Sequence, residues 1–221
     1  MEHFIETARF NMIEQQIRPW DVLDDRVLEA MMAVPRERFV PGAFLGLAFA
    51  DTEIPIGHGQ HMLEPRIVGR MLQALRPAPT DRILEIGSGT GYGTACLARL
   101  GGAVIGLELY AELAETARAN LASLGIENAE VQTGDGFAAT LTDGPFDVIA
   151  LAGSVPSIEA IDGLKGHLSP EGRLFAVVGE PPLMEAVLIR RRGDTGFHQE
   201  SLFETCIPAL ANAPKPRRFV F

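Results

Sequence analysis

The pattern of hydrophobic and polar positions divides the chain into two parts of different character. Up to residue 75, hydrophobic residues recur every three or four positions, as in 27–32 and 67–75, which is typical of amphipathic helices. After the proline-rich connector Arg76–Thr80, short uninterrupted hydrophobic runs alternate with helical segments. Such runs are typical of strands that helices cover on both faces. The pattern predicts an α/β fold in which a helical extension precedes an open, doubly wound, mostly parallel sheet.

The individual elements follow from the same pattern. In the extension we expect helices at 5–17, from Asp24 or Asp25 to Pro35, and from Glu64 onward, with proline in the first turn of the last. We expect one domain over 1–221, made of the extension 1–75, the α/β core 76–212 and a tail 213–221. The core strands are expected at 82–86, 103–109, 129–133, 147–152 and 172–178, followed by an antiparallel hairpin of 186–190 and 197–207 at one edge.

The first core strand runs directly into a glycine-rich loop. Residues 83–91 read Ile-Leu-Glu-Ile-Gly-Ser-Gly-Thr-Gly, with glycine at every second position of the loop. Glycine lacks a Cβ, so such a loop can turn sharply and bring its backbone N–H groups against a ligand. The spacing fits neither the G-x-G-x-x-G pattern of dinucleotide sites nor a phosphate loop ending in Gly-Lys-Ser/Thr. The loop therefore predicts a ligand that is neither a dinucleotide nor a nucleoside triphosphate.

Two acidic residues at strand ends extend this prediction. Glu108 lies 21 positions after Gly87, at the end of the second predicted strand, where a carboxylate can accept both ribose hydroxyls of an adenosine. Asp135 follows the third predicted strand. Taken singly, such features are often only a tight turn, a solvated acid or a helix cap. The three occur in order, one strand apart, at the sheet edge where ligands of such folds bind.

The pattern Glu85-x-Gly87-x-Gly89-x-Gly91 resembles motif I of the class I methyltransferases. The resemblance implies a Rossmann-like fold, S-adenosyl-L-methionine as cofactor and S-adenosyl-L-homocysteine as product. It further implies that Glu85 and the glycine loop contact the methionyl end of the cofactor, Glu108 the ribose and Asp135 the adenine amino group. The candidate cofactor-binding residues are Glu85, Gly87, Ser88, Gly89, Thr90, Gly91, Glu108, Leu109, Asp135 and Gly136.

Composition and charge restrict the partners. With 47% hydrophobic and 22% charged residues, the composition is that of an ordinary soluble globular protein. A formal charge of −10 disfavours binding to a nucleic-acid backbone. The N-terminus carries acids rather than a secretory hydrophobic run, and the longest apolar stretch, 39–50, is too short to span a membrane. We expect a cytoplasmic protein without nucleic-acid or membrane partners, and with Cys96 and Cys206 as buried packing residues.

Four segments outside the cofactor motifs resemble the protein-L-isoaspartate O-methyltransferase family: 26–31, 34–41, 54–60 and 202–208. The match covers almost the whole chain. It implies methyl transfer to the carboxylate of isoaspartyl residues in proteins or peptides. Such a carboxylate, with a pKa near 4, is ionised at neutral pH, so the reaction needs no general base. Catalysis then depends on holding one of its oxygens about 3–3.5 Å from the methyl carbon, in line with the sulfur.

The chain departs from this family in one segment. After Gly-x-Gly-Gln the family normally reads Thr-Ile-Ser-x-Pro, and the serine hydroxyl is expected beside the acceptor carboxylate and the transferable methyl. This chain has His61 in the position of the threonine and Leu63 in the position of the serine. Leucine offers no hydrogen bond, and the neighbouring Glu64 would repel an anionic acceptor if it pointed inward.

The departure leaves several functions open. Gln60, His61 or backbone N–H groups can orient a carboxylate acceptor in place of the serine, which makes Gln60, His61 and the Leu63 position the candidate catalytic residues. Alternatively, His61 or Glu64 serves as a general base for a small-molecule acceptor. A metal cluster of His58, His61 and Glu64 matches no established zinc spacing, and we expect no metal. A protein that binds S-adenosylmethionine without isoaspartyl repair also fits the sequence.

Overall fold

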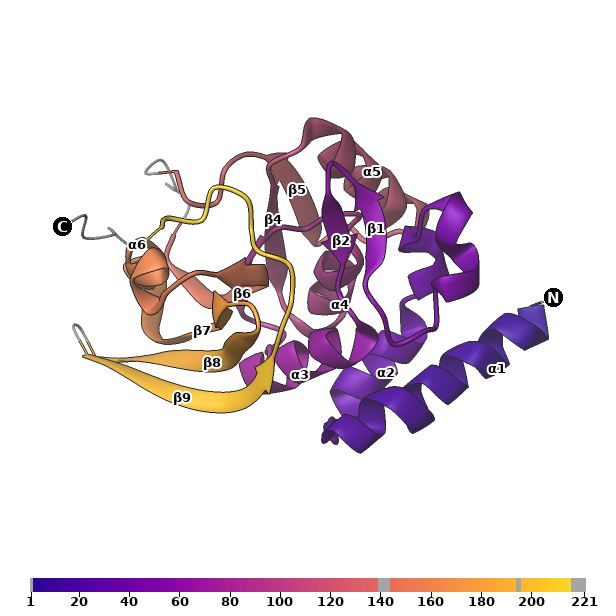
Figure 1. Ribbon diagram of the computed structural model, residues 1–221, viewed down its shortest axis with the longest axis horizontal. Helices are drawn as coiled ribbons and strands as arrows, with labels where there is room; N and C mark the ends of the chain where they lie inside the picture. Colours follow the sequence, from indigo (N-terminus) through magenta and orange to yellow (C-terminus); the bar gives the residue numbers. More distant parts are fainter. Residues whose placement is uncertain (1, 139–143, 194–195, 216–221) are drawn as a thin grey trace.

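A seven-stranded sheet forms the centre of the protein, whose computed structural model describes residues 2–138, 144–193 and 196–215. The strands are β3 (Arg82–Ile86), β4 (Ala103–Glu108), β5 (Ala129–Thr133), β6 (Phe146–Val155), β7 (Leu168–Glu180), β8 (Leu183–Arg192) and β9 (Gly196–Thr205). Their order is β5-β4-β3-β6-β7-β8-β9, with β3 to β7 parallel and the last two antiparallel. The predicted α/β class, mostly parallel sheet and antiparallel C-terminal hairpin are confirmed (Figure 1).

The predicted strand positions hold, but several strands are longer than their hydrophobic runs. β3 and β5 coincide with the predicted ranges, whereas β6, β7 and β8 continue at both ends. In β7, for example, Pro170 and Glu171 are exposed while the segment 174–177 is buried. A hydrophobic run marks only the part of a strand that helices cover, so the pattern underestimates strand length.

Helices surround the sheet and make up most of the N-terminal extension. Asp24 caps the second helix by accepting a hydrogen bond from the backbone N of Arg26 at 3.0 Å, as its sequence predicts. The helix expected at 5–17 is observed, but its last part, residues 13–17, is a π-helical turn. The helices are α1 (Glu2–Met12), α2 (Asp25–Ala33), α3 (Pro65–Leu75), α4 (Tyr92–Leu100), α5 (Ala111–Ser123) and α6 (Asp162–Lys165), with the shorter turns η1 (Ile13–Ile17), η2 (Arg18–Trp20), η3 (Arg36–Phe39), η4 (Gly42–Leu47) and η5 (Ile158–Ile161).

The hydrophobic core lies on both faces of the sheet. Successive residues of a strand point to opposite faces, and along β6 they enter different clusters. Val148 packs in a cluster with Ile17 and Met71 of the extension, whereas Ile149 packs in a second cluster with Leu164 of α6. The extension therefore shares a core with the sheet. The division into 1–75, 76–212 and 213–221 stays a prediction, and residues 216–221 of the expected tail lie outside the described part.

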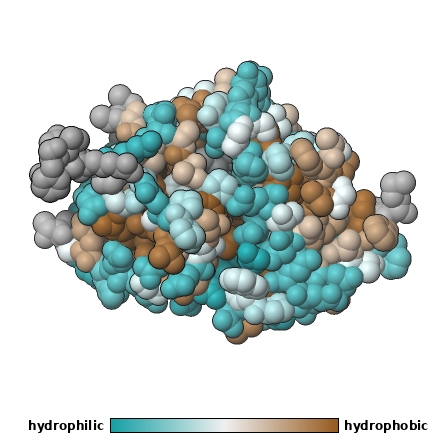
Figure 2. Space-filling model, in the orientation of Figure 1, coloured by the Kyte–Doolittle hydropathy of each residue, from teal (hydrophilic) through white to brown (hydrophobic). Residues whose placement is uncertain are grey.

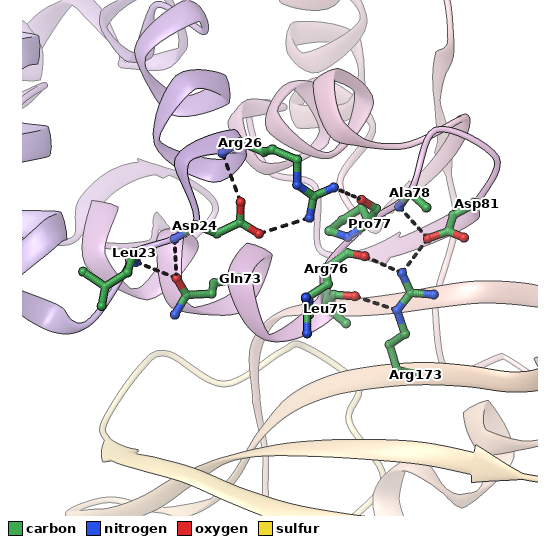
Figure 3. Close-up of polar contacts among 10 residues, drawn as sticks. All are labelled: Leu23, Asp24, Arg26, Gln73, Leu75, Arg76, Pro77, Ala78, Asp81 and Arg173. Carbon is green, nitrogen blue, oxygen red and sulfur yellow. Dashed lines mark hydrogen bonds and ion pairs between the residues drawn. The ribbon is translucent and has the colours of Figure 1, made fainter.

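Arg173 of β7 attaches the connector between α3 and β3 to the sheet (Figure 3). Its Nε donates to the carbonyl oxygen of Leu75 at 2.5 Å, and Nη2 donates to that of Arg76 at 2.7 Å. The same Nη2 forms an ion pair with Asp81 at 2.5 Å, and both side chains are largely buried. Because these contacts join residues more than 90 positions apart, one side chain fixes where the extension meets the core.

A short hairpin lies over one edge of the main sheet, where the sequence predicted only a loop. Strands β1 (Ile54–Gly57) and β2 (Gln60–Met62) are antiparallel, with Pro55 opposite His61. The turn contains three successive residues with positive φ, 104° at Gly57, 52° at His58 and 68° at Gly59. Proline and glycine conceal the alternation in which Ile54 and Ile56 are buried, so the hydrophobic pattern is too short to reveal the strands.

Polar and hydrophobic residues both reach the molecular surface. In Figure 1, α1 lies at one end of the molecule and the β8–β9 hairpin at the other. Figure 2 shows a hydrophobic area over η4, where Leu45 and Leu47 are exposed.

Cys96 is buried as expected, but Cys206 is exposed, because it follows an edge strand that is itself largely exposed. Within the described ranges, no helix is both long enough and apolar enough to cross a lipid bilayer.

Candidate functional site

The ends of four parallel strands form a cavity of about 580 Å³, part of it open to solvent. β3 contributes the start of the glycine loop, β4 ends in Glu108, and Asp135 follows β5 by two residues. Ala152 and Gly153 of β6 complete this edge. The hairpin β1–β2 supplies a further wall through Ile56, Gln60 and His61, so the extension covers part of the strand ends.

All three glycines of the loop have a positive φ, and at two of them a Cβ would also come very close to a neighbouring side chain. Gly87 has φ of 86°, and a Cβ there would lie 2.6 Å from Cδ2 of Leu210. Gly89 has φ of 55°, and a Cβ there would lie 2.9 Å from Cδ1 of Ile56. Both conformations are rarely adopted by other residues. The loop thus brings bare backbone to the cavity surface, which is where a ligand can approach most closely.

Glu108 is buried and held in one orientation beside the glycine loop. Its Oε2 accepts a hydrogen bond from the backbone N of Gly89 at 2.8 Å, and its Oε1 accepts one from that of Tyr110 at 3.0 Å. The side chain lines the cavity although the residue is only 4% exposed. Each carboxylate oxygen has a second lone pair, so Glu108 can still accept hydrogen bonds from a ligand's hydroxyl groups.

Asp135 lines the same cavity from the neighbouring strand end. Its Oδ1 accepts a hydrogen bond from the backbone N of Phe137 at 2.9 Å, and its Oδ2 accepts one from Nδ2 of Asn212 at 3.0 Å. The first contact fixes the carboxylate within its own turn. The second connects it to the C-terminal segment, which the sequence did not indicate as part of the site.

A second cavity of about 400 Å³, part of it open to solvent, also borders the glycine loop. Glu85, Ser88, Thr90 and Tyr92 contribute polar groups to its wall, and Thr90 Oγ1 is buried without a hydrogen-bond partner among the described residues. A buried hydroxyl of this kind costs free energy unless a ligand or a water molecule satisfies it. Apart from His61 and three glycines, the remaining lining is apolar and comes from Ile56, Met62, Leu63, Val68, Met71 and Ala152.

Glu85 is an acidic group in an almost fully buried position. Burial raises the pKa of its carboxyl to about 7, although a hydrogen bond from the Thr94 hydroxyl acts in the opposite direction. The nearby charge of Glu108 also raises this pKa. A carboxyl group with such a pKa becomes a strong binding partner for a cationic group that enters the cavity, because the cation favours its ionised form.

The structure brings together most of the predicted site residues. Gly136 and Leu109 line the larger cavity with the residues described above, whereas Leu63 lines only the smaller one. Gly91 lines neither cavity and instead occupies the N-cap position of α4. Its predicted contact with the cofactor remains untested, as do the predicted roles of the other residues.

Two of the three residues in the metal hypothesis, His58 and Glu64, line neither cavity. His58 stacks on Tyr110, with ring centroids 4.6 Å apart, and lies 3.3 Å from Glu112. Glu64 accepts a hydrogen bond from Nη2 of Arg66 at 3.0 Å, and burial raises the pKa of its carboxyl. Within the described ranges, no group of three or more His, Cys, Asp or Glu residues could hold a metal ion.

The sequence did not reveal the contribution of the C-terminal segment. Residues 208–211 return from β9 to the ligand-binding edge and line the larger cavity. They are held there because Ser154 of β6 donates to the carbonyl oxygen of Pro208 at 2.9 Å and accepts from the backbone N of Leu210 at 2.9 Å. No local sequence pattern predicts this pairing. Only the resemblance of 202–208 to a known family draws attention to this part of the chain.

The protein has the class I methyltransferase fold. Its sheet is mostly parallel, and the two cavities lie at the ends of the parallel strands. Solved structures agree with this fold. A protein-L-isoaspartate O-methyltransferase superposes with a TM-score of 0.77 at 23% identity, covering 93% of this chain and 66% of that one. A Plasmodium falciparum protein described as a beta-aspartate methyltransferase, in complex with S-adenosyl-L-homocysteine, superposes with a TM-score of 0.75 at 22% identity, covering 91% and 97%.

The chain belongs to the protein-L-isoaspartate(D-aspartate) O-methyltransferase family, whose family model matches residues 7–212. The protein-L-isoaspartate O-methyltransferase of Methylorubrum extorquens (strain PA1) is 43% identical over 190 residues, which cover 86% of this chain and 82% of the relative. That of Koribacter versatilis (strain Ellin345) is 40% identical over 206 residues, covering 92% and 91%. The match therefore includes the N-terminal extension as well as the α/β core.

Proposed function

We propose that this protein transfers a methyl group from S-adenosyl-L-methionine to the carboxylate of isoaspartyl residues in proteins and peptides. The observation that carries the proposal is the family match over residues 7–212. It includes the extension that supplies Ile56, His61 and Leu63 to the cavity walls as well as the strand ends. The likeness thus extends to the part of the chain that faces an acceptor.

The two cavities fit the two ends of this cofactor. The larger cavity presents the carboxylates of Glu108 and Asp135, which suit the ribose hydroxyls and the adenine amino group. The smaller cavity presents the buried carboxyl of Glu85, which suits an ammonium group, and the unpartnered Thr90 hydroxyl. When bound, the cofactor supplies a methyl group activated by a positively charged sulfur.

The residues of this chain would contribute chiefly by placement and by excluding water. The acceptor carboxylate is ionised at neutral pH, so no residue has to remove a proton from it. Leu63 and Met62 line the smaller cavity, where their apolar side chains would exclude water from the reacting groups. Holding the carboxylate oxygen near the methyl carbon would then supply a large part of the rate enhancement, as it does in other bimolecular reactions.

The apolar surroundings of Leu63 favour one alternative acceptor class. Leu63 is 6% exposed and forms part of an apolar wall with Met62, Val68 and Met71. A small acceptor with a hydrophobic part would fit such a wall better than a peptide backbone. This alternative keeps the cofactor and the fold but changes the substrate.

Methyl transfer to a matched pair of peptides tests the proposal. One peptide contains isoaspartate and the other aspartate at the same position, and both are incubated with the protein and S-adenosylmethionine labelled in the methyl group. The proposal predicts label in the isoaspartyl peptide alone. Absence of label in both peptides contradicts it, and label that enters a small-molecule fraction of a cell extract supports the alternative acceptor.

A further inference from the structure

The two cavities meet at a junction formed by five shared lining residues: Ile56, His61, Gly87, Gly89 and Ala152. In S-adenosylmethionine the sulfur joins the adenosine to the amino-acid end. A cofactor with its adenosine in the larger cavity and its amino-acid end in the smaller one has its sulfur at this junction. Among the five shared residues, His61 has the only side chain that can form a hydrogen bond.

His61 is also uncommitted within the described part of the chain. Its Nδ1 is buried and has no hydrogen-bond partner there. The backbone around it is fixed, because His61 pairs with Pro55 in the hairpin and Arg36 donates from Nη2 to the carbonyl oxygen of Leu63 at 2.8 Å. Arg36 is itself fully buried and also donates from Nε to the carbonyl oxygen of Ala48. The backbone thus places His61 at a fixed point of the hairpin, and its unpartnered Nδ1 is a group that a ligand can satisfy.

The neighbouring candidates are committed elsewhere. Gln60 lines only the larger cavity, and its Nε2 donates to the carbonyl oxygen of His58 at 3.3 Å. Glu64 is paired with Arg66 through Oε1, and although its Oε2 is buried without a partner among the described residues, the residue lines neither cavity. Leu63 lines the smaller cavity but has no hydrogen-bonding side chain. The choice among the residues of this segment therefore falls on His61.

We infer that His61 donates a hydrogen bond from Nδ1 to one oxygen of the acceptor carboxylate and thereby directs the other oxygen at the methyl group. This inference rests on the proposed function. The new bond joins the carboxylate oxygen to the methyl carbon, and the methyl–sulfur bond breaks with its electron pair remaining on sulfur. No proton is transferred, so the imidazole keeps its proton throughout. His61 thus supplies the hydrogen bond that Leu63 cannot.

Three variants test this assignment: His61→Leu, His61→Asn and, as a matched control, His198→Leu on the exposed strand β9. The amide nitrogen of asparagine can occupy the place of Nδ1, so His61→Asn keeps a donor there. We expect His61→Leu to lower kcat/KM for the isoaspartyl peptide about 10- to 100-fold, the usual effect of losing a hydrogen bond to a charged group. His61→Asn should recover most of this loss, and His198→Leu should match the wild type.

A binding measurement separates this role from a general disturbance. Calorimetry would measure the Kd of the isoaspartyl peptide for the protein saturated with S-adenosylhomocysteine, and the Kd of S-adenosylhomocysteine itself. His61→Leu should weaken peptide binding about tenfold or more while the Kd of S-adenosylhomocysteine changes by less than about threefold. Wild-type values of both kcat/KM and peptide Kd in His61→Leu would overturn the inference.

The remaining outcomes are also decisive. If His61→Leu loses affinity for S-adenosylhomocysteine, its lowered turnover has two possible causes, and the turnover of His61→Asn distinguishes them. Near wild-type turnover in His61→Asn supports the inference, whereas lost turnover in His61→Asn with normal binding of S-adenosylhomocysteine overturns it. If the wild type itself methylates no isoaspartyl peptide, the proposed function fails, and the role of His61 toward a carboxylate fails with it. If the wild type is active and His61→Leu keeps the wild-type kcat/KM and peptide Kd, only the inference about His61 is refuted, and the proposed function stands.

Discussion

At the scale of single residues, Glu85 links proton binding to ligand binding. Its carboxyl has a pKa of about 7 because burial disfavours the charged form. Near pH 6 it is therefore mostly protonated in the unliganded protein. An ammonium group in the smaller cavity would stabilise the ionised form and lower this pKa. Binding of such a ligand below pH 7 must then release a proton, and its affinity must increase as the pH rises toward 7.

This linkage gives a direct prediction for S-adenosylhomocysteine. Titration calorimetry at pH 6, repeated in two buffers of different ionisation enthalpy, should show the release of close to one proton per ligand bound. Glu85→Gln, which preserves shape but cannot ionise, should release none and bind more weakly. Equal binding enthalpies in the two buffers for the wild type would argue against a contact between Glu85 and the ammonium group.

Glu108 provides a second prediction at this scale. Glu108→Ala should weaken binding of S-adenosylhomocysteine by about 1.5–3 kcal/mol, because charge-assisted hydrogen bonds to the ribose are lost. The loss of its contact with the backbone of Gly89 would add to this effect. Glu130→Ala, an exposed acid on β5, is the control and should leave the affinity unchanged. Unaltered affinity in Glu108→Ala would refute the assignment to the ribose.

At the scale of elements, Arg173 joins the extension to the sheet and its removal tests that connection. Arg173→Met should lower the free energy of unfolding by about 2–3 kcal/mol, because Asp81 and two carbonyl oxygens lose a largely buried charged donor. Urea denaturation measures this change. The control is Arg192→Met, which breaks an exposed ion pair with Glu171 and should cost less than about 1 kcal/mol. Equal effects of the two substitutions would contradict this role of Arg173.

Elements that carry a strong local pattern were predictable from the sequence, and those held by distant contacts were not. The buried runs around Ile83 and Ile149 mark their strands because helices cover both faces. The β1–β2 hairpin escaped prediction because Pro55 and its glycines interrupt a very short alternation. The segment around Leu210 is held at the site by pairing with β6, more than fifty positions away, and by the contact of Asn212 with Asp135. No pattern within the segment itself encodes that contact.

The same division applies to the candidate site. The glycine loop, Glu108 and Asp135 were found because strand ends of a parallel sheet meet at one edge. Proximity of His61 to the glycine loop was not predictable from spacing, since the hairpin that carries it packs against the edge through tertiary contacts. The raised pKa of Glu85 likewise depends on burial by residues of other elements.

At the scale of the whole molecule, ligand binding should stabilise the fold, because the two cavities are lined by both the extension and the sheet. S-adenosylhomocysteine at one hundred times its Kd should add about 2.7 kcal/mol to the free energy of unfolding. For a chain of this size, that corresponds to a rise in Tm of about 5–10 °C. Scanning calorimetry measures the rise, and a Tm indifferent to saturating ligand would count against binding between the two parts.

A crystal structure of the complex with S-adenosylhomocysteine would show directly how the two cavities divide the ligand. We expect the adenine beside Asp135, the ribose hydroxyls on Glu108, the amino group facing Glu85 and the sulfur at the junction beside His61. A ligand bound outside the two cavities, or one whose sulfur lies away from the residues that both cavities share, would contradict this expectation.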